Sequence, residues 1–210
     1  MKQTQGEKSE RSRSVILEAA LALFSHQGYR STSIREIAQA AGVSTGNVYH
    51  HFPDKEALFR TLLDQYWAAI DAPDFPFNRA LAAGAFPHDL EALGAAAEES
   101  VRLYRRHVAL IYVDVVEFDG SHIRKFYSGM PARFASFIDH RFPDNTLKDQ
   151  LSPGTDPTMA LMVTSRIFLH YFAVEILFGV PDQLGMGSAA AIREISGLLR
   201  HGIIQAKDPG

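Results

Sequence analysis

The chain has 210 residues, of which 46% are hydrophobic, no cysteine, and a formal net charge of −3. This length and apolar content allow one or two domains with a packed core. The lack of cysteine excludes disulfides and thiolate metal sites and suits a reducing compartment. The polar start, MKQTQGEKSERSRS, is unlike a secretory signal, and we find no run of about 18 uncharged apolar residues. We therefore expect a cytoplasmic protein without a membrane span.

Charge is divided unevenly along the chain. Residues 1–60 carry eight Lys and Arg against six Asp and Glu, whereas residues 61–210 carry thirteen against eighteen. A small positive excess predicts modest non-specific attraction to nucleic acid, so any sequence specificity must come from groove fit and dimerisation.

A first helix is predicted from Ser12 to Gln27, ending at Gly28, because apolar residues recur there at helical spacing. Residues 1–10 are polar and are expected to be a disordered, solvated tail. In the alternative, basic residues of this region form an arm that touches the minor groove or phosphates. These residues are Lys2, Lys8, Arg11 and Arg13.

Two short helices joined by a tight turn are predicted between Thr32 and Lys55. Ser33 and Glu36 have the spacing of a capping box at the start of the first of them. Gly42 follows the last apolar residue of that helix, where a residue that accepts a positive φ is favoured. Ser44 is placed to cap the second helix.

The spacing of Ala38, Gly42 and Val48 is that of a helix-turn-helix, in which a small residue permits close crossing and an aliphatic residue anchors the second helix. With Val48 inward, short polar side chains face outward toward base edges, and asparagine pairs best with adenine. Flanking residues suit phosphate contacts. The candidate DNA-binding residues are Thr32, Ser33, Ser44, Thr45, Gly46, Asn47, Tyr49, His50, His51 and Lys55. The alternative is an ordinary helical hairpin in a core.

A connecting helix is predicted from Lys55 to about Asp71. The next segment, 72–87, contains three prolines and three phenylalanines. Because prolines break helices, we expect a loop with one short turn whose phenylalanines pack onto the body. Recognition of a peptide by these aromatic side chains is an alternative.

Further helices are predicted in the rest of the chain. Residues 89–116 form one long helix or a short helix followed by a longer one, and Pro131 should kink or split a helix over 122–141. Asp156 and Pro157 begin a helix over 158–178 that is apolar nearly all round. Such a helix must be buried on more than one face, so a partner subunit is expected to cover it. The last helix is predicted over 188–204.

Catalytic motifs are not found in the sequence. There is no Gly-x-Ser-x-Gly elbow, phosphate-binding glycine loop, His-Glu-x-x-His or Cys/His array. The nine histidines have no convincing partner at i,i+4. We therefore expect no enzyme activity, no cofactor and no metal.

The body is rich in aromatic residues, since eleven of fourteen phenylalanines follow residue 60. Aromatic residues at helical spacing usually belong to a core. A sharper hypothesis is an apolar effector pocket with a few polar groups. Its candidate lining is Tyr104, His107, Ile111, Phe126, Met130 and Phe168.

The run from Gly28 to Phe59, GYRSTSIREIAQAAGVSTGNVYHHFPDKEALF, resembles the DNA-binding domain of the tetracycline-repressor (TetR) family of transcriptional regulators. The resemblance implies an all-α fold, with a helix-turn-helix head over 1–55 joined by a connecting helix to an effector-binding and dimerisation body over 56–210. It also implies that the helices over 158–178 and 188–204 pair with their mates as a four-helix bundle. Thr45 stands where the family often has a basic residue.

The function implied is a dimeric regulator that binds double-stranded DNA. We expect a repressor released from a palindromic operator by a small hydrophobic or amphipathic effector. The sequence leaves open whether the effector weakens or strengthens DNA binding. Two alternatives remain. One is a helical enzyme or small-molecule carrier with a head that merely resembles a helix-turn-helix, and the other is an adaptor that binds only protein.

Overall fold

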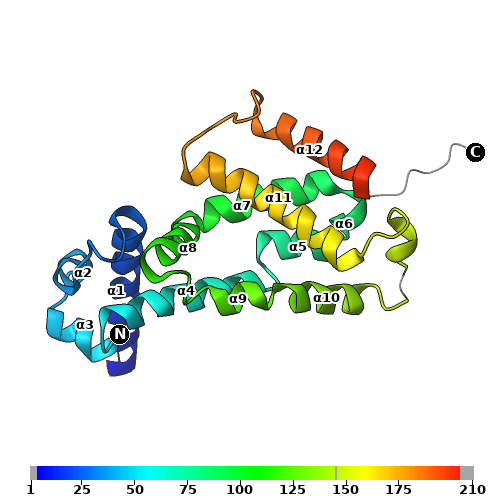
Figure 1. The fold of residues 1–210 in the computed structure, drawn as a ribbon. Coiled ribbons are helices and arrows are strands. Elements are labelled where there is room, and N and C mark those ends of the chain that lie inside the picture. The colour runs from blue at the N-terminus through cyan, green and yellow to red at the C-terminus, as the bar shows by residue number, and fades with distance from the viewer. Residues whose placement is uncertain (1–3, 145, 204–210) are drawn as a thin grey trace, which may run out of the picture. The chain divides into compact units, whose positions relative to one another are not determined.

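The computed structural model describes residues 4–144 and 146–203, and their regular elements are helices, which confirms the all-α class (Figure 1). The chain divides into two compact units. The first unit comprises residues 1–69 and 106–125, and the second comprises 70–105 and 126–210. We had expected a division at residue 55. The observed grouping differs because a helix distant in sequence packs with the amino-terminal helices.

Five helices build the first unit, with α4 and α8 extending slightly beyond it. They are α1 (Gln5–Gln27), α2 (Ile34–Ala41), α3 (Thr45–His51), α4 (Lys55–Asp71) and α8 (Arg105–Phe118). Their apolar faces form one core, in which Leu110 of α8 is buried with Phe24 of α1 and Phe59 of α4. Residues 106–118 therefore belong to the folded head, although they lie far from it in sequence.

Helix α1 begins at Gln5, so the prediction of a disordered segment through residue 10 was wrong for the residues described. Thr4 and Glu7 form a capping box, in which the Thr4 hydroxyl accepts from the Glu7 N–H at 3.2 Å and the Glu7 carboxylate accepts from the Thr4 N–H at 2.7 Å. This local cap starts the helix before its apolar face begins, which explains why apolar periodicity missed it. Lys2 lies outside the described residues.

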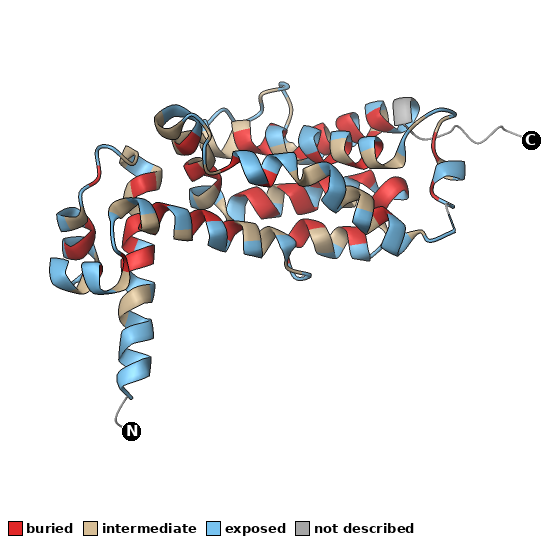
Figure 2. Cartoon of the chain, turned by 60° about the horizontal axis from the view of Figure 1, so that its bottom comes forward, coloured by how far each residue is buried: buried red, intermediate tan, exposed pale blue. Residues whose placement is uncertain are grey.

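The second unit is built around α7. Its helices are α5 (Pro76–Ala82), α6 (Ala85–His88), α7 (Leu90–Leu103), α10 (Met130–Arg141), α11 (Pro157–Leu177) and α12 (Ser188–Ile203), with α9 (Arg124–Ser128) at its boundary and a 3-10 turn at Lys148–Gln150. Gly94 of α7 permits close packing, because a Cβ there would lie 2.8 Å from both Ile192 of α12 and Phe168 of α11. Buried residues gather on the inner sides of these helices (Figure 2).

Segment 72–87 holds two short helices rather than the predicted loop. Pro76 occupies the first turn of α5, where a missing N–H costs nothing, so this proline starts a helix instead of breaking one. The expected packing of the aromatic residues is confirmed, since Phe75, Phe77 and Phe86 are all buried.

Each of the two longer patterns divides into two helices, and in the first pattern both have 14 residues instead of the expected short helix followed by a longer one. The 89–116 pattern is split at Tyr104 into α7 and α8, and the 122–141 pattern is split before Pro131, which lies in the first turn of α10. Asp156 caps α11, with its carboxylate accepting from the Met159 N–H at 2.7 Å. These outcomes confirm the predicted proline and cap positions.

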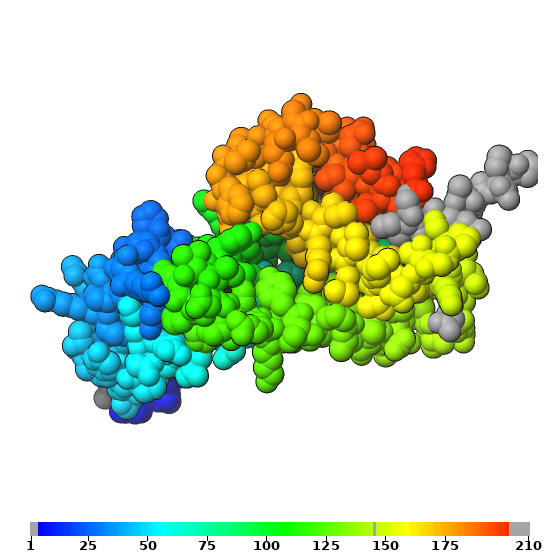
Figure 3. Space-filling model, in the orientation of Figure 1, coloured from blue at the N-terminus to red at the C-terminus, as the bar shows by residue number. Residues whose placement is uncertain are grey.

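Helix α11 is apolar on two faces. One face is buried in the second unit, and the other exposes Met159, Val163 and Ile167 at i,i+4 spacing. By length and a mean hydropathy of 1.4 it also meets the criteria for a membrane span, but half of that window is buried inside the chain. Helices α11 and α12 lie side by side on the surface of the second unit (Figure 3).

Candidate nucleic-acid interface

Helix α3 exposes a polar face to solvent and is anchored to the core by one buried residue. Val48 is fully buried, whereas Tyr49 is 56% exposed and Thr45, Gly46 and His50 are also exposed. The Ser44 hydroxyl caps the helix by accepting from the Asn47 N–H at 3.1 Å. The predicted anchor and cap are thus confirmed.

The preceding helix and turn are also formed as predicted. Ser33 and Glu36 make the capping box of α2, with the Ser33 hydroxyl donating to the Glu36 carboxylate at 2.7 Å. These hydrogen bonds from Ser33 lower the pKa of Glu36. Gly42 ends α2 with φ of 67°, in the left-handed region that favours glycine. Local chemistry therefore specifies the whole helix-turn-helix.

An open pocket of about 660 Å³ lies between the start of α2 and the exposed face of α3. Its lining is Arg30, Ser31, Thr32, Ser33, Ile34, Arg35, Thr45, Tyr49, Asp54 and Lys55. Two of these residues, Arg30 and Arg35, were missed by sequence reasoning, although both flank the cap at Ser33. The N-terminus of a helix with nearby guanidinium groups is suited to bind a phosphate.

Two of the candidate DNA-binding residues, Thr32 and Lys55, form hydrogen bonds within the chain. The hydroxyl of Thr32 donates to the Gly28 carbonyl at 2.7 Å, and the residue is only 1% exposed. The ammonium group of Lys55 donates to the carbonyls of Tyr29 and Thr32 at 2.8 and 2.7 Å and lies 4.1 Å from the centre of the Tyr29 ring. Burial lowers the pKa of Lys55. The expectation that Lys55 is exposed was wrong, because the carbonyls of the α1–α2 turn converge on it.

Two further candidates are partly engaged within the chain. Ser12 of α1 donates its hydroxyl to Oδ1 of Asn47 at 2.6 Å. His51 is half-buried, and its pKa is lowered by burial and then by the neighbouring His50 and Arg13. Both side chains therefore have less freedom than an outward-facing helix position suggests.

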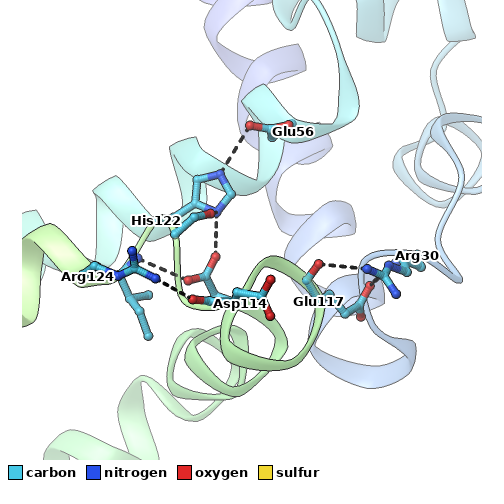
Figure 4. A network of polar contacts seen from close by, with 9 residues as sticks. Arg30, Glu56, Asp114, Glu117, His122 and Arg124 are labelled. Atoms are coloured by element: carbon cyan, nitrogen blue, oxygen red, sulfur yellow. Dashed lines mark hydrogen bonds and ion pairs between the residues drawn. The ribbon is translucent and has the colours of Figure 1, made fainter.

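Glu117, near the end of α8, holds the α1–α2 turn (Figure 4). Its carboxylate accepts from the backbone N–H groups of Tyr29 and Arg30 at 2.9 and 2.6 Å, and the Arg30 guanidinium donates to the Glu117 carbonyl at 3.1 Å. Gly28 makes room for this approach, since a Cβ there would lie 2.6 Å from the carboxylate. Sequence reasoning did not single out Glu117, because its partners lie almost ninety residues away.

A second contact ties the turn after α8 to α4. Nδ1 of His122 lies 2.6 Å from the fully buried Asp114 carboxylate, and its Nε2 lies 3.4 Å from Glu56 (Figure 4). The other oxygen of Asp114 accepts from the Ile123 N–H at 3.2 Å. The end of α8 is thereby joined to both borders of the helix-turn-helix.

The six candidate effector residues do not all lie in one unit. His107 and Ile111 belong to the first unit, and the other four belong to the second. Phe168 is fully buried and packs in the core, which favours the core alternative for that residue. His107 lines an open groove of about 390 Å³ with residues of α1 and α4. Within residues 4–144 and 146–203, no three His, Asp or Glu side chains group as a metal site would require.

A capped two-helix motif with a buried anchor and an exposed polar second helix defines the helix-turn-helix class of DNA-binding domains. Residues 16–62 match the family model described as bacterial regulatory proteins, tetR family. This match confirms the resemblance of the amino-terminal segment to the TetR family that its motif predicted.

Curated relatives match over only part of the chain. The chain is 33% identical over 103 residues to YuxN of Bacillus subtilis, an uncharacterised HTH-type transcriptional regulator, with 49% of this chain and 30% of that protein covered. It is 53% identical over 53 residues to the HTH-type transcriptional regulator AcrR of Shigella flexneri, with 25% of each chain covered. The matches thus span less than half of these relatives.

The fold as a whole is similar to that of a solved repressor. NalD, the secondary repressor of the MexAB-OprM multidrug efflux pump in Pseudomonas aeruginosa, has a TM-score of 0.64 at 23% identity, with 95% of this chain and 100% of NalD covered. At this identity the similarity establishes the fold alone.

Proposed function

We propose that the chain is a sequence-specific, DNA-binding transcriptional regulator that acts as a homodimeric repressor. The observation that carries this proposal is the exposed polar face of α3, anchored by Val48 and lying beside a pocket that contains Arg30 and Arg35. A recognition helix of this kind enters the major groove with its first residues against base edges.

The interface residues take different roles in this proposal. Thr45, Gly46, Asn47 and His50 face the groove, while Tyr49, Arg30 and Arg35 contact phosphates together with the capped start of α2. Ser33, Ser44 and His51 flank these contacts. Thr32 and Lys55 act indirectly, by holding the turn that carries Arg30.

The dimer is proposed to form through α11 and α12. Support comes from the exposed apolar stripe of Met159, Val163 and Ile167 on α11 and from Leu198 of α12, which is 76% exposed. Pairing of two such surfaces would bury them in a four-helix bundle. To bind successive major grooves, the two heads of such a dimer must lie about 34–36 Å apart.

A small hydrophobic or amphipathic effector is proposed to release the repressor from its operator in the cytoplasm. Coupling of this kind typically amounts to about 1–3 kcal/mol. Tyr104, Phe126 and Met130 of the second unit remain candidates for contact with the effector. Calorimetry with a panel of lipophilic compounds tests this part, because the effector must bind and must also change operator affinity. We propose no catalytic role for the chain.

Selection of duplexes from a random DNA pool by the full-length chain tests the central proposal. The expected product is a palindrome whose half-sites lie one helical turn apart. Tyr49→Ala should weaken binding without unfolding the chain, since Tyr49 is exposed, whereas Tyr127→Ala is a matched control at an exposed tyrosine of the second unit. Failure to enrich any sequence would overturn the proposal.

A further inference from the structure

The side-chain amide of Asn47 is fixed by a residue outside the helix-turn-helix. The Ser12 hydroxyl of α1 donates to Asn47 Oδ1 at 2.6 Å, across 35 residues of sequence. The Asn47 backbone N–H is already bound by Ser44 Oγ. An asparagine side chain has an oxygen with two lone pairs and an NH2 group with two donors, so Ser12 occupies one lone pair and leaves both donors for a ligand.

The contact with Ser12 belongs to a wider attachment of α3 to α1. The guanidinium of Arg13, the next residue of α1, lies 5.1 Å from the centre of the Phe52 ring, and Phe52 is the C-cap of α3. Helix α1 therefore touches α3 at its third residue and again at its end. Two separate contacts hold the helices in the register that places Ser12 beside Asn47.

This geometry changes which base Asn47 can read. Bidentate pairing of asparagine with adenine requires the amide oxygen and the amide nitrogen to face the same base edge, but the bond from Ser12 directs the oxygen toward α1. A lone NH2 donor instead suits the acceptor edge of guanine, at O6 and N7, or of thymine, at O4.

We propose that Ser12 is a specificity-determining positioning residue, which presents Asn47 to the major groove as a donor that selects guanine or thymine over adenine. This inference rests on the proposed function, because it concerns how α3 reads DNA. Asn47 is the third residue of α3, within the part of a recognition helix that faces base edges.

The test begins with selection from a random duplex pool by the wild-type chain. Asn47→Ala then identifies the base pair of each half-site that Asn47 reads. A guanine or thymine is expected at that position for the wild type. Ser12→Ala frees the amide, so the preference for that base over adenine should fall about tenfold, with other positions unchanged.

Two further variants separate this effect from a loss of folding. Ser14→Ala makes the same chemical change at an exposed serine of α1 and should leave both base preference and melting temperature unchanged. Asn47→Asp keeps an acceptor for Ser12 but presents an oxygen to the groove. It should therefore shift the preference at that position toward cytosine or adenine, which carry amino donors.

Several outcomes would overturn the inference. One is adenine at the Asn47 position in the wild-type selection, and another is an unchanged preference in Ser12→Ala when Asn47→Ala alters it. A third is an equal loss of affinity for all sequences in Asn47→Ala, which would indicate a phosphate contact. Absence of any selected sequence for the wild type would count against the proposed function itself.

Discussion

The side chain of Lys55 stabilises the fold of the head. Its ammonium group donates to two carbonyls of the α1–α2 turn and lies over the Tyr29 ring. Buried or half-buried carbonyls need such partners, because an unpaired polar group costs free energy. A basic residue beside a recognition helix is therefore not always a phosphate contact.

Lys55→Met should destabilise the chain, because methionine is also a long unbranched side chain but cannot donate to the two carbonyls. We expect a loss of about 1–3 kcal/mol of unfolding free energy, measured by chemical denaturation. Lys8→Met, at an exposed lysine of α1, is the control and should change stability by less than about 0.5 kcal/mol. Equal stabilities for the two variants would contradict the assigned role of Lys55.

His107 makes stability depend on pH. Its ring stacks on Tyr66 at 5.6 Å, and burial lowers the pKa of His107, partly offset by Glu18. The unfolded chain therefore binds more protons than the folded chain below the ordinary histidine pKa of about 6.5. The contribution of neutral His107 to stability is complete above that pH and is lost as the pH falls toward its lower folded value.

Thermal melting between pH 5 and 7.5 measures this effect. The wild type should lose stability with acidification from about pH 6.5 downward. His107→Phe keeps a ring against Tyr66 but has no proton to bind, so its melting temperature should fall less steeply over this range. Identical slopes for the two proteins would show that His107 does not contribute.

At the scale of elements, α8 determines how the turn beside the recognition helix is held. Glu117 accepts two consecutive backbone N–H groups of that turn, and His122 joins the loop after α8 to α4. Arg30, which lines the pocket beside α3, follows directly from this turn. The position of α8 should therefore affect DNA affinity without any contact between α8 and DNA.

Glu117→Ala should lower the affinity for the selected operator several-fold and reduce stability by about 1–3 kcal/mol, because the backbone N–H groups of Tyr29 and Arg30 lose their acceptor. Fluorescence anisotropy and denaturation measure the two effects. Glu98→Ala removes a carboxylate from an exposed pair with Arg102 and should cost less than about 0.5 kcal/mol. Unchanged operator affinity for Glu117→Ala would remove α8 from this role.

At the scale of the whole molecule, the exposed apolar surface of α11 and α12 is the basis of the proposed dimer. The α11 side chains Met159, Val163 and Ile167 are 56%, 40% and 38% exposed, on a helix whose other face is buried. Water contact with such a stripe is unfavourable, and a second copy of the chain would remove it.

Val163→Glu should convert the proposed dimer to a monomer, because a charge would be buried in the bundle. Sedimentation measures the change in mass, and operator affinity should fall at least tenfold as the two heads separate, since each loses the other's contribution to binding. Val116→Glu places the same charge at a valine of α8 that is 77% exposed and should remain dimeric. Monomers in both variants, or in the wild type, would argue against this interface.

The helix-turn-helix could be predicted from the sequence because the interactions that determine it are local. The capping boxes join residues three apart, Gly42 meets a backbone requirement of its own position, and Val48 follows from helical periodicity. The same local chemistry identified the caps of α3 and α11 and the division of the helix at Pro131. Apolar periodicity did not predict the start of α1 or the helices of segment 72–87. A polar capping box and a first-turn proline start these helices without a long apolar face.

The tertiary structure alone decided what the interface side chains do. Ser12 with Asn47, Lys55 with Tyr29, and Glu117 with Tyr29 are pairs separated by 35, 26 and 88 residues. No periodicity relates such positions, because their contact depends on how α1, α4 and α8 pack around a shared core. Residue type and spacing thus determined the motif and its resemblance to a family, whereas packing determined which of its polar groups bond within the chain.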